Sequence, residues 1–518
     1  MGAPTRGSAA SGKAAGSAGY LRKDGHADTE SAAGAALPTL AEVVEDIGLG
    51  WAQLRAGFLG GGVWLADGSE LLLISSVAQA VSAEWGLSHY ERGMVVTIVF
   101  LGILSGNLIS GPLGDSFGRR EMIIISYFSI FVFSIMSSYS TGYWNLVIVR
   151  FFVGASFGLG QPSWGALCVE ITPVSHRIAM NSWTQALFSI GEMYSAILIM
   201  ADDPKMRKLS WRWLLQAGAV PALLFGLLAS FFLNQSPSYL ALHGRREEAA
   251  LVLKSMRRDN GSAGASVDFQ LVPQIKTGSF FANVNRQFNV IFSKRLRVST
   301  AIVVYSCFTL NMVFYGCLYA FPQVLPDVFS SESGRSASAE LLFGALWELP
   351  GLLLGFILGT TMPRKLVIKL YAAMVGLSLL VFASGCYWNS DNLFVQVCLR
   401  VGYYGVKCFT NVGFVVVYQY SIEIYPAEAR VTGTAFNLAG GRMAGISAPL
   451  LFEFAKIGFG NCAFFYCCAF LAIINFLLVD LLPYETSGKD SKECEHHHEH
   501  DDYGAVEARE SVAGPNTA

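Results

Sequence analysis

Twelve long apolar stretches, separated by shorter polar segments, constrain this chain more than any other feature. A stretch of about 20 apolar residues crosses a bilayer as a helix, because lipid offers no partners for unpaired backbone groups. Only 14% of the residues are charged, against about 25% in a typical soluble protein, and the mean hydropathy is +0.44. We therefore expect an all-α membrane protein with twelve transmembrane helices. The predicted spans are residues 57–80, 93–113, 121–140, 144–168, 180–200, 212–233, 298–321, 340–360, 365–386, 394–421, 431–452 and 462–482.

A short motif recurs after the fourth and the tenth predicted span. Glu170, Pro173 and Arg177 return with the same spacing as Glu423, Pro426 and Arg430, which lie 253 residues later (423 − 170). The recurrence indicates a duplicated membrane unit, and hence two pseudo-symmetric halves of six helices each. Parallel repeats of this kind occur in transporters that rock two halves about a central site.

The polar segments divide the chain into five parts. We predict a disordered N-terminal tail, a first six-helix half, a linker, a second six-helix half and a disordered acidic and His-rich tail, at 1–38, 39–233, 234–297, 298–484 and 485–518. Lys and Arg concentrate in the linker and in the loops on the same side, which predicts that this side and both termini are cytosolic. The membrane itself, plasma or vesicular, is left open.

Several classes of function lack a signal in the sequence. The chain has no ATP-binding loop, no metalloprotease motif, no nucleic-acid module and no set of residues typical of nucleophilic catalysis. The His-rich tail could bind a metal only weakly, because flexible ligands have no fixed geometry. We therefore expect neither an enzyme nor a cofactor or metal site, and no nucleic-acid partner. Oligomeric state is left open.

A glycine-rich basic motif lies between the second and third spans and runs from Gly111 through Gly114, Asp115 and Gly118 to Arg119 and Arg120. It resembles the G-x-L-A-D-x-x-G-R-K signature of the major facilitator superfamily. The corresponding place in the second half keeps the basic pair Arg364 and Lys365 but has Thr in place of the acid. The resemblance implies the fold of that superfamily, with transport by alternating access.

Further segments narrow the resemblance to one branch of the superfamily. Residues 39–53, the segment Trp64-Leu-Ala-Asp67-Gly-Ser-Glu70, Trp211-Arg-Trp213-Leu and Glu348-Leu-Pro350-Gly351 look like the synaptic-vesicle-protein-related branch. The resemblance covers about residues 38–484. It implies that charged residues at the cytosolic ends form an ion-pair lock in the outward-open state. Matched residue by residue, the lock comprises Gly111, Gly114, Asp115, Gly118, Arg119, Arg120, Glu170, Arg177, Glu423 and Arg430.

Polar and ionisable residues inside the spans are the candidates for a solute or coupling site, since an ionisable residue at mid-membrane costs on the order of 2.5 to 3.5 kcal/mol and usually faces a cavity. Their helical spacing places several on single faces of the first, fourth, fifth, seventh and tenth spans. The candidates are Asp67, Glu70, Arg150, Gln161, Gln185, Glu192, Asn311, Tyr315, Glu348, Arg400, Lys407 and Asn411. For Arg150, Glu348 and Arg442 the competing interpretation is an internal ion pair or a polar contact between helices, and the three glycines beside Arg442 also suit a role in packing.

The sequence thus predicts a carrier of a small organic solute that works by alternating access, with proton coupling through Asp67, Glu70 or Glu192 as a further hypothesis. The alternative is a membrane sensor or vesicle structural protein, derived from a transporter, that carries nothing. The charge of the solute is open, because acids in the first span suit a cation or zwitterion and Arg400 with Lys407 suits an anion. An anion or zwitterion is favoured slightly, since those two cations share one helix face and would otherwise lie unpaired.

Overall fold

Long helices form wherever the sequence predicts an apolar span. The computed structural model describes residues 37–262, 264, 267–270, 280–329, 336–386, 392–426, 429–460, 462–483 and 485, and this part contains helices and no strand. The tail predictions for 1–38 and 485–518, including the His-rich segment, lie outside the described residues except at 37, 38 and 485. The described residues from 38 onward belong to one compact unit.

The first helix group, termed the N group, covers the first six predicted spans. Its helices are α2 (Trp51–Trp85), α3 (His89–Phe117), α4 (Arg119–Ser138), α5 (Tyr143–Ile171), α6 (Arg177–Asp202), α7 (Trp211–Gly218) and α8 (Val220–Phe232). Within it α3 and α4 pack on α5, and α2 packs on α6.

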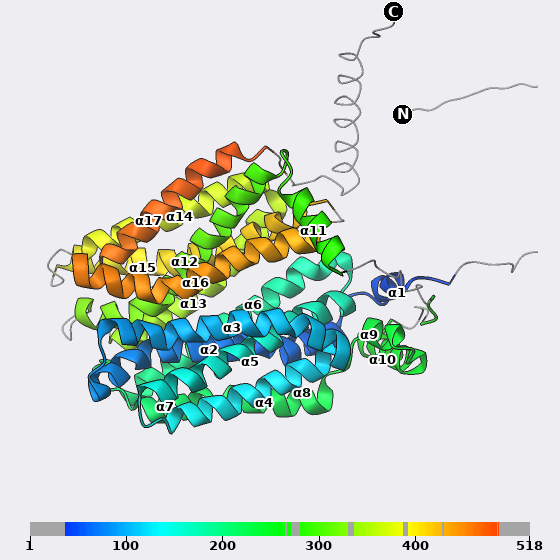
Figure 1. Cartoon of the computed structure of the whole chain (residues 1–518), viewed down its shortest axis with the longest axis horizontal. Helices are drawn as coiled ribbons and strands as arrows, with labels where there is room; N and C mark the ends of the chain where they lie inside the picture. Colours follow the sequence, from blue (N-terminus) through cyan, green and yellow to red (C-terminus); the bar gives the residue numbers. More distant parts are fainter. Residues whose placement is uncertain are drawn as a thin grey trace, which may run out of the picture. The chain divides into compact units, whose positions relative to one another are not determined.

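The second helix group, termed the C group, covers the remaining spans. Its helices are α12 (Arg297–Val328), α13 (Ala337–Thr361), α14 (Arg364–Gly385), α15 (Leu393–Glu423), α16 (Arg430–Phe459) and α17 (Ala463–Leu478). Here α13 and α14 pack on α15, and α12 packs on α16. In both groups, therefore, the second and third long helices pack on the fourth, and the first packs on the fifth. Figure 1 shows the two groups as separate bundles, the N group coloured blue to green and the C group coloured green to red-orange, which meet along α3, α6, α13 and α16.

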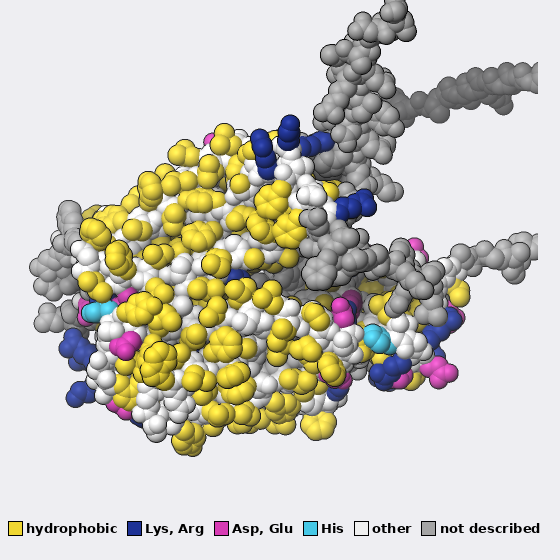
Figure 2. All heavy atoms as spheres, in the orientation of Figure 1, with side chains coloured by type: hydrophobic (Ala, Val, Ile, Leu, Met, Phe, Trp, Pro, Cys, Tyr) yellow, Lys and Arg dark blue, Asp and Glu magenta, His cyan; other side chains and the backbone are white. Residues whose placement is uncertain are grey.

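Ten helical segments in the described part of the chain are long and apolar enough to cross a membrane. Helices α15 and α16, with 31 and 30 residues, lie at the tenth and eleventh predicted spans but are not among the ten. Hydrophobic side chains also cover the outer face of both bundles, whereas charged side chains gather toward the ends of the helices (Figure 2). Ile148, Leu353 and Ile457, for example, are 57%, 62% and 65% exposed, as expected for side chains that face lipid.

Glycines allow the closest helix contacts in the N group. A Cβ on Gly154 of α5 would lie 2.0 Å from the Val99 carbonyl oxygen of α3, and one on Gly102 would lie 2.2 Å from the Phe151 carbonyl oxygen. Small residues at such crossings are typical of helix packing in membranes, where backbones must approach closely. The sequence therefore fixes the α3–α5 pair largely through positions that lack a side chain.

A layer of short helices lies at one end of the N group. It consists of α1 (Leu40–Ile47), α9 (Pro237–Leu242) and α10 (Arg246–Asn260), whereas α11 (Phe280–Ile291) packs on α16 of the C group. Thr39 and Glu42 form a capping box at the start of α1. We call the end of the helices that carries this layer the linker end, and the other the opposite end.

Asn260 attaches the linker to the first long helix. Its side-chain oxygen accepts a hydrogen bond from the backbone N–H of Ala52 at 2.9 Å, in the first turn of α2, and its amide nitrogen donates to the Gly48 carbonyl at 3.0 Å. The N-cap position of α2 is Gly50, which has no side chain to cap the helix, so Asn260 supplies the cap from 208 residues away. The Arg55–Asp259 ion pair at 2.8 Å supports the same contact.

Candidate functional site

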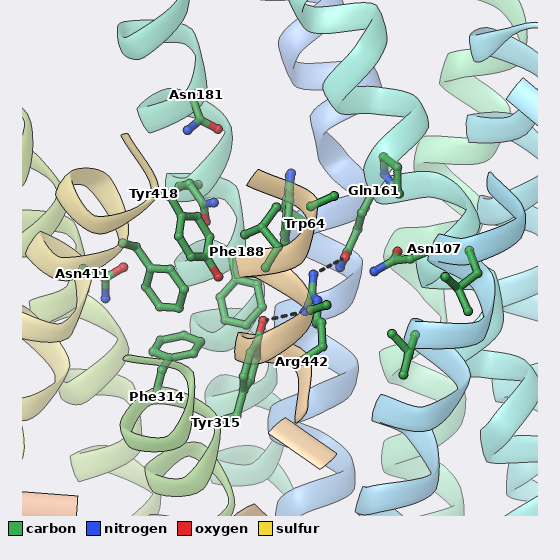
Figure 3. A pocket seen from close by; sticks show the side chains of 18 residues that line it. Trp64, Asn107, Gln161, Asn181, Phe188, Phe314, Tyr315, Asn411, Tyr418 and Arg442 are labelled. Carbon is green, nitrogen blue, oxygen red and sulfur yellow. Dashed lines mark hydrogen bonds between the residues drawn. The ribbon is translucent and has the colours of Figure 1, made fainter. Parts of the chain in front are cut away.

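A cavity of about 450 Å³ lies between the N group and the C group. Aromatic side chains and amides dominate its lining, and Arg442 of α16 is the one charged side chain among the described residues that line it. The lining residues of α3, α6, α15 and α16 come from the linker-end halves of these helices, so the cavity lies toward the linker end. The labelled side chains in Figure 3 converge on it from both helix groups and include Trp64, Asn107, Gln161, Asn181, Phe188, Phe314, Tyr315, Asn411, Tyr418 and Arg442.

Gln161 connects the two groups at the wall of this cavity. Its amide nitrogen donates to Asp67 Oδ2 at 2.7 Å, and its amide oxygen accepts from Arg442 Nη2 at 3.1 Å. Arg442 Nη1 also donates to the hydroxyl of Tyr315 at 3.3 Å. Asp67 is fully buried, and its Oδ1 has no hydrogen-bond partner among the described residues. Arg442 therefore lines the cavity, in addition to the packing role that its glycine neighbours suggested.

Glu70 and Arg150 form an ion pair inside the N group, not a face of the cavity. Arg150 Nη1 donates to Glu70 Oε2 at 2.7 Å, and both residues are at most 2% exposed. Because each charge has a buried partner of opposite sign, this pair holds α2 to α5. The competing interpretation of Arg150 as an internal ion-pair residue is therefore the one that the geometry favours.

Lys407 of α15 lies between two carboxylates and joins the two groups. Its Nζ is 2.5 Å from Glu192 Oε2 of α6 and 2.7 Å from Glu348 Oε1 of α13, while Ser189 donates to Glu348 Oε2 at 2.7 Å. All three charged residues are at most 5% exposed. Two carboxylates and one ammonium carry a formal charge of −2 + 1 = −1 if all are ionised, so this buried triad can hold one proton.

The expectation that Arg400 and Lys407 would lie unpaired was wrong. Arg400 forms an ion pair with Glu340 of α13 at 2.8 Å, and Tyr404 also donates to Glu340. These contacts lie in the opposite-end halves of α13 and α15, away from the cavity lining. The preference for an anionic solute cannot rest on these two cations.

Of the remaining candidates inside the spans, three line the cavity and one lies behind its wall. Gln185, Tyr315 and Asn411 line the cavity, whereas Asn311 lies behind it, where its amide nitrogen donates to the Cys307 carbonyl at 2.7 Å and to the Tyr418 hydroxyl at 3.1 Å. Asn311 therefore positions an aromatic side chain of the lining.

A second polar cluster, which the sequence analysis missed, closes the opposite end. Arg92 of α3 donates to Glu453 of α16 through Nε at 2.7 Å and Nη2 at 2.5 Å, and Tyr319 of α12 donates to Glu453 at 2.5 Å. His89 Nδ1 lies 3.2 Å from Glu453 and 2.9 Å from Arg92. Arg92 and Glu453 are 361 residues apart, and both lie near the ends of their helices, where charge is usual. Only the fold brings them together.

Hydrogen bonds between the groups extend this closure. Thr97 of α3 donates to the Ile446 carbonyl of α16 at 3.0 Å, and Ser338 of α13 donates to the Pro204 carbonyl at 3.0 Å. The loop that holds Pro204 is organised by Asp203, which accepts from the backbone N–H groups of the next residues, among them Arg207 at 2.7 Å. Burial would raise the pKa of Asp203, but these backbone N–H groups hold the pKa below its ordinary value, so the carboxylate stays charged.

The lock residues of the N group pair with one another at the linker end. Arg119 contacts Asp115 at 2.9 Å and Glu170 at 3.3 Å, while Asp115 stays 74% exposed. Arg120 donates to the carbonyls of Leu233 and Ser230, both at 2.6 Å. Gly118 has φ of 102° between α3 and α4, a conformation that favours glycine; Gly114 is buried, and Gly111 is exposed.

Two other lock residues, Arg177 and Glu423, also make contacts within their own helix groups. Arg177 donates to the Val169 carbonyl at 3.1 Å in the N group. Arg364 lies 3.5 Å from Glu423 in the C group, and Arg430 has a buried Nε without a partner among the described residues. The family's lock would join the groups, and the contacts above join residues within each group.

The fold defines the class of protein to which the chain belongs. The inward-open xylose transporter XylE from E. coli superposes with a TM-score of 0.68 at 18% identity, covering 86% of this chain and 98% of that one. Its partially occluded inward-open form superposes with a TM-score of 0.65, covering 85% and 99%. The chain therefore has the fold of a multi-pass transporter of the major facilitator superfamily.

The family follows from sequence comparison. Residues 56–497 match the model of the Sugar (and other) transporter family, and the chain belongs to this family. It is 25% identical over 476 residues to the synaptic vesicle 2-related protein of Xenopus laevis, covering 88% of this chain and 82% of that one. It is 27% identical over 490 residues to the organic cation/carnitine transporter 7 of Arabidopsis thaliana, covering 87% and 95%. The predicted resemblance to the synaptic-vesicle-related branch is confirmed.

Proposed function

We propose that this chain is a carrier that moves a small organic solute across a membrane by alternating access, with α15 and α16 completing twelve spans in two pseudo-symmetric halves. The observation that carries the proposal is the asymmetry between the ends. A cavity of about 450 Å³ lies toward the linker end, while ion pairs and hydrogen bonds between the groups close the opposite end. A cavity of this volume suits a small solute.

The linker end is proposed to be the cytosolic end. The excess of Lys and Arg in the linker favours this orientation, which makes the arrangement inward-open with both termini in the cytosol. The similarity to inward-open XylE supports the same conformation. Plasma and vesicle membranes are both compatible, and the synaptic vesicle 2-related relatives favour the second.

The lock residues are proposed to act in the outward-open state of the transport cycle. In the arrangement described, Arg119 is held by Asp115 and Glu170 of its own group. We propose that closing the cavity at the linker end brings these charges against the C group, so that the lock forms in the outward-open state. Of the three nominated coupling acids, Glu192 forms an ion pair with Lys407 of the C group, and Asp67 is linked to Arg442 of the C group only through Gln161. Glu70 pairs within its own group.

Uptake by purified protein in lipid vesicles tests the proposal. A panel of radiolabelled organic acids, amines and sugars is applied at several values of external pH, and protein-free vesicles are the control. Saturable uptake of at least one solute is expected. Binding of a solute without uptake would favour the alternative, a sensor or structural protein derived from a transporter.

A further inference from the structure

Gln161 links Arg442, the only charged residue described in the cavity lining, to the fully buried Asp67 behind it. A carboxylate can only accept hydrogen bonds and a guanidinium can only donate them, so the amide must direct its nitrogen toward Asp67 and its oxygen toward Arg442. The chain of hydrogen bonds runs from α2 through α5 to α16, and therefore from the N group to the C group. Figure 3 shows Gln161 and Arg442 meeting across the cavity wall.

The charges around this relay are balanced. Asp67 and Glu70 are negative, Arg150 and Arg442 are positive, and the sum is −2 + 2 = 0. Glu70 contacts Arg150 directly at 2.7 Å, which leaves Arg442 as the counter-charge of Asp67. Tyr315 of α12 is the neighbouring hydroxyl, and Glu192 of α6 is held by Lys407. A monoanion bound at Arg442 would therefore give this region a net charge of −1, with no counter-charge left for Asp67.

We propose that the cavity binds a small organic monoanion at Arg442, and that the anion competes with the Gln161–Asp67 relay for this guanidinium, so that each bound anion brings one proton onto Asp67. The proton comes from water and converts the Asp67 carboxylate into the neutral acid; no bond of the solute changes. This inference rests on the proposed function and names its solute class and its coupling step.

The lining fits such a solute better than the alternatives. Trp64, Phe188, Phe314, Phe414 and Tyr418 offer flat apolar surfaces for the body of the solute. Arg442 makes single hydrogen bonds through Nη1 and Nη2, and its planar group can hold a carboxylate with two parallel hydrogen bonds. An organic cation would be repelled by Arg442, and its natural partner Asp67 is fully buried behind the amide.

Gln161 is then the residue that converts anion binding into proton uptake. With the relay intact, the hydrogen bond from Gln161 and the positive charge of Arg442 favour the ionised form of Asp67 in the empty cavity. When a carboxylate takes Arg442, the relay no longer supplies positive charge, and a buried carboxylate without a counter-charge takes up a proton. If the relay is cut, Asp67 should already be protonated before the anion arrives.

The test uses the purified full chain in lipid nanodiscs, with benzoate as the probe and benzamide as its neutral counterpart. Isothermal titration calorimetry in buffers of different ionisation enthalpy, over about pH 5 to 8, counts the protons taken up per bound ligand. At pH values where Asp67 is ionised in the empty cavity, the wild type should take up close to one proton per benzoate, and none with benzamide. Asp67→Asn should bind benzoate without proton uptake.

Two further pairs of variants separate the relay from general structure. Arg442→Gln should weaken benzoate by about 10- to 100-fold, and Arg442→Lys by less, because Lys keeps the charge but not the two parallel hydrogen bonds. Gln161→Leu should bind benzoate with no proton uptake, whereas Gln185→Leu, which removes a cavity amide outside the relay, should keep the uptake per bound ligand.

Three results would overturn the inference: no benzoate binding by the wild type, benzoate binding without proton uptake, or unchanged affinity in Arg442→Gln. These results are distinct from failure of the proposed function. Vesicles that accumulate a neutral solute independently of pH would uphold transport by this chain and refute only the anion and proton assignment.

Discussion

The ion pair between Arg92 and Glu453 should hold the opposite end closed, and neutralising Glu453 should open it. Glu453 is 2% exposed, and Arg92 donates to it at 2.7 and 2.5 Å. A hydrogen bond to a charged group contributes about 1.5 to 3 kcal/mol when buried, and much less where water replaces the partner. Glu453→Gln should therefore favour the open opposite end by about 2 kcal/mol, or about 30-fold in the ratio of the two states, since about 1.4 kcal/mol corresponds to tenfold.

Labelling of a cysteine placed at Thr97 measures this shift. Thr97 is 5% exposed in the closed end and should become accessible when α3 separates from α16. In a background without other reactive cysteines, the labelling rate of Thr97→Cys should rise with Glu453→Gln. Glu91→Gln is the matched control, because it removes the same charge from the start of α3, where the Glu91 carboxylate accepts hydrogen bonds from the capping Ser88. Equal labelling rates in the two variants would refute the role of the ion pair.

Three other substitutions test the packing on which this account depends, each by thermal unfolding of the purified protein. Gly154→Ala should lower the free energy of unfolding by about 1 to 3 kcal/mol, because the added methyl group overpacks against α3. Gly165→Ala lies in the same helix, where a Cβ meets nothing within 4 Å, and should be neutral or stabilising. Equal effects of the two substitutions would contradict the close crossing of α3 and α5. Lys407→Gln should lower the free energy of unfolding by about 3 to 5 kcal/mol, because it leaves the buried carboxylates of Glu192 and Glu348 without their counter-charge. Neutralising both carboxylates in the same variant should restore much of this stability. If it does not, Lys407 acts by packing. Asn260→Ala should lower the free energy of unfolding by about 0.5 to 2 kcal/mol, because it removes the cap of α2. Substitution of the exposed Lys254 by Ala should change the stability little. Indistinguishable melting curves of the two variants would argue against the cap.

The sequence was sufficient to predict the helical architecture because lipid leaves few alternatives. Each apolar stretch must form a helix, and a helix lies at every one of the twelve predicted positions. The superfamily resemblance was likewise visible in the motif around Asp115, because that motif is local in sequence. Ion-pair partners were not visible. Arg400 and Glu340 are 60 residues apart, and no local pattern shows that their helices pack side by side.

Arg442 lines the cavity but was not among the candidates, although the sequence could have revealed it. It lies in the middle of an apolar stretch, where a charge is costly and usually functional, yet its glycine neighbours favoured the packing interpretation. The packing reading is itself partly right: a Cβ on Gly441 would lie 2.5 Å from the Asn311 side chain. Both roles occur on one helix because α16 turns one face to α12 and another to the cavity, and periodicity alone cannot assign Arg442 to either.

The most direct test of alternating access compares distances at both ends of the molecule as solute is added. Electron–electron double resonance between spin labels at Phe117 and Ile422 reports the linker end, and a second pair at Tyr90 and Phe459 reports the opposite end; all four side chains are exposed. A transported solute should shorten the first distance and lengthen the second in the same population of molecules. Alternating access would be contradicted if both distances changed in the same direction, or if both stayed fixed while solute is transported.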